Sequence, residues 1–287
     1  MLTKTFFSTP KGSNKWYNYI LVPIYVVILA ALFSVPAFII LSKPKPNTYQ
    51  SYLQLLLPSA MLVFSTFLVL KWVHRRSGYS LINATKIRWN RIFWAMGCFG
   101  SITLLFELVS WFENPSSYQF SFDKSTFFQY LIISLVLIPF QSAGEELLMR
   151  GYFLQGIAWA TKRPWLAVLI TSVLFGLLHL GNPELKAFGY VFILNYMLMG
   201  LVAGIMTVMD DGTELAIGVH IINNLYSAIF IGYTSSALQT STIYHIKDYD
   251  TTFLSFSMIL GSVIFLGICY KKYQWNSFKS FFDKLAD

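Results

Sequence analysis

Charged residues are scarce in this chain of 287 residues: Asp, Glu, Lys and Arg make up 12% of it, whereas 55% is hydrophobic. A soluble domain is about a quarter charged, so this shortage argues against one. The apolar residues gather in runs of about 20, a length that crosses a bilayer as a helix. The net charge of +8 does not indicate nucleic-acid binding, because the basic residues lie beside the apolar runs, as the flanks of membrane spans do. These observations predict an integral membrane protein.

Cysteine is also rare. The two cysteines, Cys98 and Cys269, lie in or beside apolar runs and imply neither a disulfide framework nor a metal site. No small-residue cleavage site follows the first apolar run, so we expect that run to be a retained span and not a signal peptide. We find no low-complexity linker and no clear internal repeat, and therefore expect residues 1–287 to form a single integral membrane domain.

The expected fold class is all-α, a polytopic bundle of about eight transmembrane helices. The expected spans cover residues 17–42, 52–73, 92–112, 127–150, 165–181, 187–209, 213–233 and 251–270. With the N-terminus inside, sixteen Lys and Arg residues fall in cytoplasmic segments and five fall outside, which places both termini in the cytoplasm. One turn disagrees, because residues 210–213 should be cytoplasmic yet carry Asp210 and Asp211. Acidic residues have little weight in this rule, so the orientation is kept.

The segment QSAGEELLMRGYF, residues 141–153, places three ionisable groups where an apolar span should continue. Each charge near a bilayer centre costs roughly 2.5–3.5 kcal/mol on insertion scales. Glu146 is four residues before Arg150, so both lie on one helical face and we expect a structural ion pair. Glu145 points about 100° away and is left without a local partner. An unpaired carboxylate inside a span predicts a functional site. The alternatives are that Glu145 is protonated and only packs against its neighbours, or that it lies shallow enough in the membrane to contact water.

The depth of His179 in the membrane matches that of Glu145. Lys162 marks the expected turn between two spans, with Glu145 17 residues before it and His179 17 residues after it. If both arms are helical, each rises roughly 26 Å from the turn. We therefore expect Glu145 and His179 at the same level on antiparallel neighbours.

A further polar pair lies in the segment HIINN, residues 220–224. His220 and Asn224 are four residues apart and share one helical face. His220 is nine residues from Asp211, a rise of about 14 Å, which would place it lower than Glu145 unless the turns differ in depth. An Asn in a membrane span often forms hydrogen bonds between helices. Here His220 and Asn224 share a face in a chain that also carries Glu145 and His179, so we interpret these residues as one polar cluster.

These residue types suit hydrolysis of an amide. A carboxylate and an imidazole, here Glu145 and His179, can activate water by general base action. A second imidazole and an amide, here His220 and Asn224, can donate to the oxyanion of a tetrahedral intermediate. Two His and one Glu are also a known zinc ligand set, although the spacing, from separate helices and without His-x-x-x-His, does not favour metal.

The order of the motifs resembles that of a known family. Glu-Glu-x-x-x-Arg at 145–150, Phe-x-x-x-His at 175–179 and His-x-x-x-Asn at 220–224 resemble the CPBP family, the CAAX prenyl endopeptidase and bacteriocin-processing (Abi) intramembrane proteases. The resemblance covers residues 127–226, which we expect to be the catalytic core.

The resemblance implies an eight-helix intramembrane endopeptidase of the glutamate type. It implies that the first Glu acts with the His of the second motif on water, and that the His and Asn of the third motif hold the oxyanion. In this chain those residues are Glu145, His179, His220 and Asn224. Glu146 and Arg150 become supporting residues.

The resemblance also sets the expected partners. We expect a membrane-associated protein or peptide as substrate, the lipid bilayer as environment, no nucleic acid, and a bacterial plasma membrane as location. We expect no cofactor and no bound metal, with a zinc-dependent variant left open. The alternatives are a non-enzymatic membrane protein, such as a bacteriocin-immunity factor or scaffold, and a proton-coupled transporter in which Glu145 carries protons. An inverted repeat would favour the transporter, and the sequence shows none.

Overall fold

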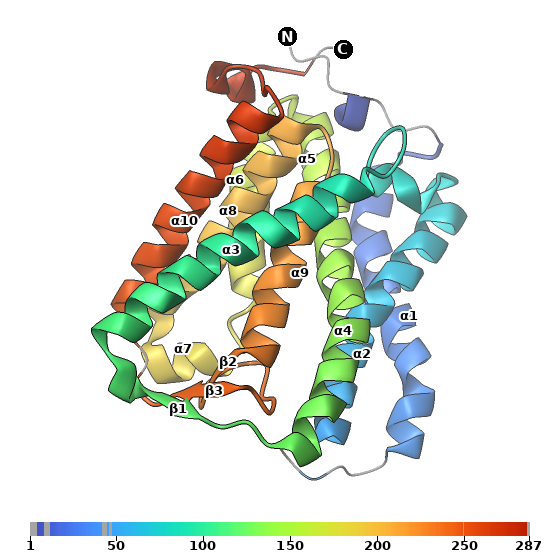
Figure 1. Ribbon diagram of the computed structural model, residues 1–287. Coiled ribbons are helices and arrows are strands. Elements are labelled where there is room, and N and C mark those ends of the chain that lie inside the picture. The colour runs from blue at the N-terminus through green and yellow to red at the C-terminus, as the bar shows by residue number, and fades with distance from the viewer. Residues whose placement is uncertain (1–4, 9–11, 42–44, 46–47, 249, 286–287) are drawn as a thin grey trace.

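The computed structural model describes residues 5–8, 12–41, 45, 48–248 and 250–285. The basic residues Lys4, Lys11 and Lys43, which the orientation count included, lie outside this part of the chain. The described chain is built mainly of helices (Figure 1). The principal helices are α1 (Asn18–Ile40), α2 (Tyr49–Val69), α3 (Trp89–Glu113), α4 (Lys124–Glu146), α5 (Leu154–Thr161), α6 (Pro164–Leu178), α7 (Pro183–Phe188), α8 (Ile193–Asp210), α9 (Glu214–Ile229) and α10 (Thr251–Lys272).

Shorter helical turns join these elements. Two of them are π-helical: η2 continues α2 and η5 joins α4 to α5. The others are 3-10 turns at the ends of the chain and in the connections. Their bounds are η1 (Thr5–Phe7), η2 (Leu70–His74), η3 (Gly78–Leu81), η4 (Pro115–Ser117), η5 (Leu147–Phe153), η6 (Tyr190–Phe192) and η7 (Phe278–Phe282).

Each of the eight expected spans contains a helix in the described part of the chain. Six helical stretches there are long and apolar enough to cross a membrane, and they make the protein a polytopic integral membrane protein. Their bounds are Asn18–Ile40, Tyr49–His74, Trp89–Glu113, Lys124–Thr161, Tyr190–Asp210 and Thr251–Lys272. Of the remaining two, α6 is apolar but has 15 residues, and α9 has 16.

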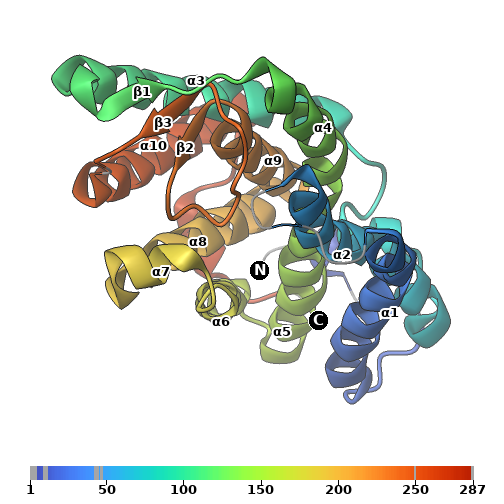
Figure 2. The same cartoon turned by 90° about the horizontal axis from the view of Figure 1, so that it is seen from below.

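The short helix α9 lies at the centre of the bundle. It packs against α3, α4 and α8, and most of its residues are buried. Figure 2 shows it between these three helices. In the most apolar stretches of the outer helices α1, α3 and α10, by contrast, only 22% of the residues are buried. Polar side chains on α9 are thereby kept from lipid, which is where a membrane protein places its functional polar groups.

A small sheet adds to the expected all-α architecture. Its strands are β1 (Tyr118–Phe120), β2 (Ile231–Tyr233) and β3 (Tyr244–Ile246), in the spatial order β1-β3-β2. β3 runs antiparallel to β1 and parallel to β2. The sheet lies at the end of the bundle opposite η1 and η7 (Figure 1). The sequence analysis missed it, because each strand has three residues and β1 pairs with a segment more than a hundred residues away.

Close packing of α6 on α8 depends on small residues. A side chain at Gly200 would bring its Cβ to 2.9 Å from Ser172 Cα, and one at Gly204 would bring it to 2.7 Å from Val168. The small-xxx-small pattern of residues 200–204 predicts such an approach, and the structure confirms it.

The acidic turn that disagreed with the charge rule is explained by long-range ion pairs. Arg88 Nη2 lies 3.0 Å from Asp210 Oδ2 and 2.6 Å from Glu214 Oε2, while Arg91 Nη1 lies 2.7 Å from Asp210 Oδ1. Trp275 Nε1 donates a hydrogen bond to the same Asp210 oxygen, at 2.8 Å. Burial alone would lower the pKa of Arg88, but its hydrogen bond to Glu214 and the nearby carboxylates raise it. Asp210 and Glu214 are buried, so the turn lies inside the protein.

The N-terminal segment contacts the same turn. The backbone N–H groups of Thr5 and Phe6 each donate to the Asp211 carboxylate at 3.1 Å, and the Thr5 hydroxyl does so at 2.6 Å. The phenyl ring of Phe6 is buried in the main core cluster. The turn before α9 is therefore braced by segments from both ends of the chain.

Candidate active site

Glu145 lies one turn after Gln141 near the end of α4, and the two side chains are hydrogen bonded. Gln141 Nε2 donates to Glu145 Oε1 at 2.6 Å. The other carboxylate oxygen, Oε2, lies 3.7 Å from His220 Nε2. The expectation that Glu145 lacks a local partner was wrong, although the i,i+4 spacing of Gln141 and Glu145 could have revealed the contact.

Glu146 and Arg150 form the ion pair that their spacing predicts. Arg150 Nη1 lies 3.1 Å from Glu146 Oε1, and both residues are 1% exposed. The guanidinium also lies over the ring of Phe175 on α6, 4.4 Å from its centroid. A second partner of Glu146 was not expected: His220 Nδ1 lies 2.8 Å from Glu146 Oε1. Both carboxylates therefore reach the imidazole of His220.

The position of His220 along the bundle differs from the sequence-based estimate, which counted nine residues from Asp211 and placed His220 lower than Glu145. The count assumed that Asp211 lies at the membrane surface. Arg88 and Arg91 instead hold the adjacent Asp210 inside the protein. His220 Nε2 lies 3.7 Å from Glu145 Oε2, so the two side chains are at the same level.

His179 follows the last residue of α6 and is fixed by two contacts. Its Nδ1 lies 2.7 Å from the Phe175 carbonyl oxygen, and its ring stacks on Tyr196 of α8 with centroids 4.4 Å apart. A carbonyl oxygen can only accept, so Nδ1 carries the proton. In the neutral ring, Nε2 then keeps a lone pair that can accept a hydrogen bond. His179 and Glu145 line the same cavity, but each forms its hydrogen bonds with other residues.

Asn224 is joined to α4 through Gln141. Its Nδ2 donates to Gln141 Oε1 at 3.0 Å and lies 3.5 Å from Ser142 Oγ. Gln141 thus holds the Asn224 amide with its oxygen and the Glu145 carboxylate with its nitrogen. The sequence analysis missed Gln141 and Ser142, because their link to α9 is a long-range contact.

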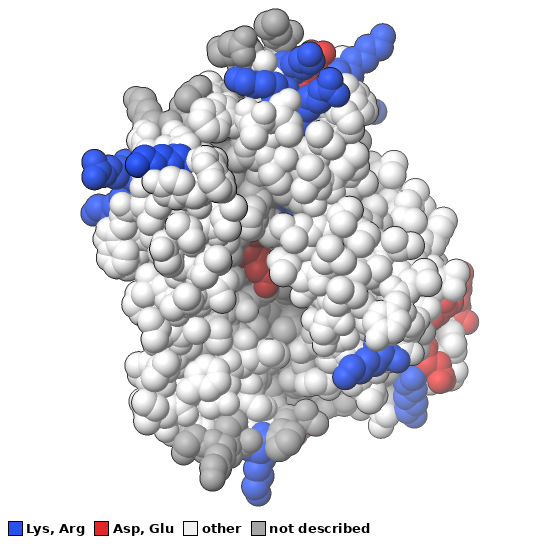
Figure 3. Space-filling view, turned by 180° about the vertical axis from the view of Figure 1, so that it is seen from behind, with Lys and Arg blue, Asp and Glu red and all other residues white. Residues whose placement is uncertain are grey.

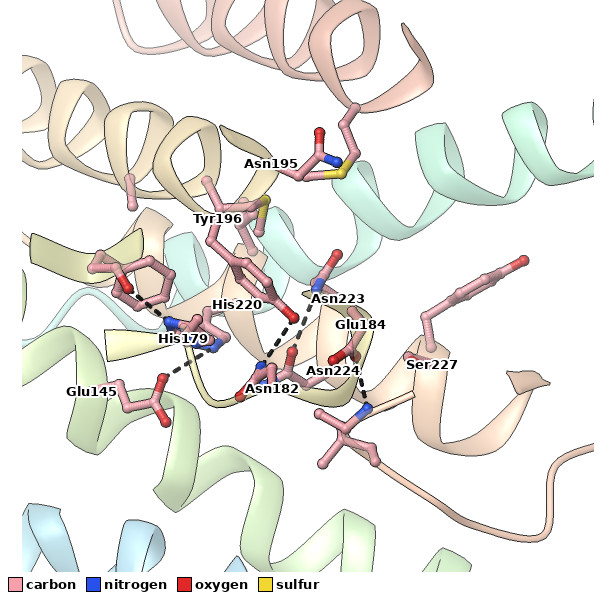
Figure 4. A pocket seen from close by; sticks show the side chains of 18 of the residues that line it. Glu145, His179, Asn182, Glu184, Asn195, Tyr196, His220, Asn223, Asn224 and Ser227 are labelled. Atoms are coloured by element: carbon pink, nitrogen blue, oxygen red, sulfur yellow. Dashed lines mark hydrogen bonds and ion pairs between the residues drawn. The ribbon is translucent and has the colours of Figure 1, made fainter. Parts of the chain in front are cut away.

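These side chains line a cavity of about 360 Å³ inside the bundle. The lining includes all six residues singled out from the sequence: Glu145, Glu146, Arg150, His179, His220 and Asn224. Figure 4 shows the labelled members facing a common space. On the outside, Figure 3 shows a hollow in an uncharged surface, with acidic atoms visible within it, and most of the visible Lys and Arg nearer one end of the molecule.

The donor set does not fit the zinc site considered from the sequence. In the described ranges of the chain, no three His, Cys, Asp or Glu side chains are grouped so that they could hold a metal ion. No step of the chemistry below is therefore assigned to a metal.

The residues that form much of this cavity belong to a segment that matches a known protein family. Residues 126–226 match the family described as type II CAAX prenyl endopeptidase Rce1-like. The chain is similar to the uncharacterized protein YyaK of Bacillus subtilis (strain 168), with 27% identity over 232 residues, which cover 80% of this chain and 76% of YyaK. No solved structure matches significantly. Over residues 126–226, which carry most of the cavity's polar residues, the chain has a domain of the Rce1-like type II CAAX prenyl endopeptidase (CPBP/Abi) family.

Proposed function

We propose that this protein is an intramembrane endopeptidase that hydrolyses a peptide bond of a membrane-associated protein or peptide. One observation carries the proposal: two carboxylates, two imidazoles and an amide of the family domain line one cavity within a helical membrane bundle. A general base and oxyanion donors, both shielded from lipid, are what amide hydrolysis by water requires.

In the proposed reaction Glu145 is the general base, and His179 assists it. Gln141 holds one oxygen of Glu145 and leaves Oε2 on the side of His220. Water between Glu145 and the lone pair of His179 Nε2 would lose its proton to Glu145 as its oxygen attacks the peptide carbonyl. The proton then passes to the leaving nitrogen, which completes hydrolysis without a covalent enzyme intermediate.

His220 and Asn224 are the proposed oxyanion donors. Nδ1–H of His220 is held by Glu146, as a carboxylate orients a histidine in other hydrolytic sites. With both ring nitrogens protonated, Nε2–H of His220 would donate to the oxyanion together with the Asn224 amide. Arg150 neutralises Glu146 and so supports the orientation of His220.

The proposal includes the arrangement in the membrane. We propose that residues 1–287 form one membrane domain, that α6 and α9 complete an eight-helix bundle, and that both termini are cytoplasmic. We further propose a bacterial plasma membrane, consistent with the similarity to a bacterial protein. The reaction as written needs no cofactor.

The test compares membrane proteins of cells that carry the wild type or Glu145→Gln. The amide cannot accept the proton from water, so we expect one or more membrane-anchored proteins to remain uncleaved in the variant. Glu113→Gln is the matched control, because this carboxylate is exposed at the end of α3. Identical peptide termini in wild-type and Glu145→Gln cells, with both proteins folded, would refute the proposal and favour a non-enzymatic role.

With a substrate in hand, Asn224→Ala separates the oxyanion role from binding. The oxyanion exists only in the transition state, so we expect the rate to fall about 10²–10³-fold with little change in KM. A larger effect on KM than on kcat would assign Asn224 to substrate binding.

A further inference from the structure

The cavity extends beyond the proposed hydrolytic residues toward the sheet end of the bundle. There it is lined by polar residues of α3, of α7 and the residue before it, and of α8, for which the hydrolytic scheme has no use. These are Glu107, Asn182, Glu184, Asn195 and Tyr196. Figure 4 shows Asn182, Glu184 and Tyr196 in the same space as Glu145 and His220.

The charge of this cavity is opposite to that of the whole chain. The protein carries a net charge of +8. Among the described residues that line the cavity, however, four carboxylates stand against two cations, the guanidinium of Arg150, which is bound to Glu146, and the imidazolium proposed above for His220. A cleft of one sign with low-dielectric walls concentrates ligands of the other sign. The carboxylates belong to Glu107, Glu145, Glu146 and Glu184.

Glu184 is a buried carboxylate that lines the cavity without a cationic partner among the described lining residues. Its Oε1 accepts the backbone N–H of Ala237 at 2.7 Å and the hydroxyl of Tyr233 at 3.3 Å. Its Oε2 is buried, and the hydroxyl of Tyr196 on α8 also interacts with the carboxylate. The residue as a whole is 4% exposed, and no Lys or Arg of the described residues that line the cavity forms an ion pair with it. A buried carboxylate without a positive partner is costly, and a cation brought by a ligand would remove that cost.

We propose that Glu184 binds the ammonium or guanidinium group of a Lys or Arg side chain in the peptide substrate. The inference rests on the proposed function and names a feature of its substrate. The neighbouring amides of Asn182 and Asn195 offer donors and acceptors suited to a peptide backbone, which favours a peptide over a free ion as occupant. Glu184 is therefore a specificity-determining residue of the sheet-side part of the cavity.

Binding is measured separately from cleavage, so that the two proposals fail independently. The protein is purified with Glu145→Gln, which retains the shape of the cavity, and is reconstituted in lipid nanodiscs. The probes are fluorescent apolar peptides of one sequence that differ at a single central position, which carries Lys, norleucine or Glu. A charged hydrogen bond is worth enough for the Lys peptide to bind about 10- to 100-fold more tightly than the norleucine peptide.

The decisive variant adds Glu184→Gln. Gln keeps an acceptor oxygen for Ala237 and Tyr233, so the local fold is retained, while the charge is lost. We expect the Lys and norleucine peptides then to bind with dissociation constants that agree within about twofold. Asp283→Asn removes one negative charge from the exposed C-terminal segment and is the control, with the preference unchanged.

Three results would overturn the inference: no Lys preference in the parent protein, a preference that survives Glu184→Gln, or an equal loss in Asp283→Asn. A Lys preference that depends on Glu184, in a protein that never cleaves, would support this binding site and refute the proposed function alone.

Discussion

Replacing Arg150 by Ala should destabilise the protein strongly. The side chain is 1% exposed, is paired with Glu146 at 3.1 Å and covers the ring of Phe175 at 4.4 Å. Removing one partner of a buried pair typically costs about 3–5 kcal/mol, because the other charge is left unpaired. His220 still donates to Glu146 in the variant, so we expect the lower end, about 3 kcal/mol, or roughly a hundredfold in the ratio of folded to unfolded protein.

The assay is reversible unfolding in mixed micelles, titrated with SDS and followed by the fluorescence of the eight tryptophans. Arg163→Ala is the matched control, because Arg163 is exposed at the turn before α6; it should change the free energy of unfolding by less than about 0.5 kcal/mol. The double variant Glu146→Gln with Arg150→Met removes both charges and should recover most of the loss. If Arg150→Ala is as stable as Arg163→Ala, the pair does not lie in a low-dielectric site and the reasoning fails.

Three further predictions follow from the fold. With cytoplasmic termini, an impermeant thiol reagent added outside cells should label a cysteine introduced at Asp123 and miss one at Lys86; the reverse pattern would invert the topology. Gly200→Ala should destabilise the protein by about 1–3 kcal/mol, because its Cβ would meet the Ser172 backbone, whereas Gly97→Ala, which meets nothing within 4 Å, should be tolerated; equal stability of the two would contradict the close α6–α8 packing. A zinc chelator should leave the cleavage rate unchanged, and stoichiometric zinc in active enzyme, lost together with activity on chelation, would reinstate the metal mechanism.

Local patterns predicted much of the fold and part of the site. Hydropathy located a helix in each expected span, since the length and composition of a span are local properties. The spacing of Glu146 and Arg150 predicted their ion pair, and Gly200 marked a close helix contact. The same spacing rule, applied to Gln141, would have found the partner of Glu145.

Long-range contacts account for what the sequence did not reveal. The turn before α9, from which the level of His220 was counted, is held inside the protein by Arg88, more than a hundred residues earlier in the chain. The strands of the sheet have three residues each, and β1 pairs with β3 across more than a hundred residues, so no local period marks them. The position of Glu184 in the cavity likewise depends on residues 233–237, which lie far along the chain from α7 and hold its Oε1.

The bracing of the turn before α9 by both ends of the chain affects how the protein can be handled. Thr5 and Phe6 bind Asp211, and Trp275 binds Asp210. A truncation of either end therefore removes a support of the helix that carries His220, even though the deleted residues lie far from the cavity. Purification tags and reporter fusions are best joined through long linkers, and a loss of activity in a shortened chain is not by itself a sign that the removed segment touches substrate.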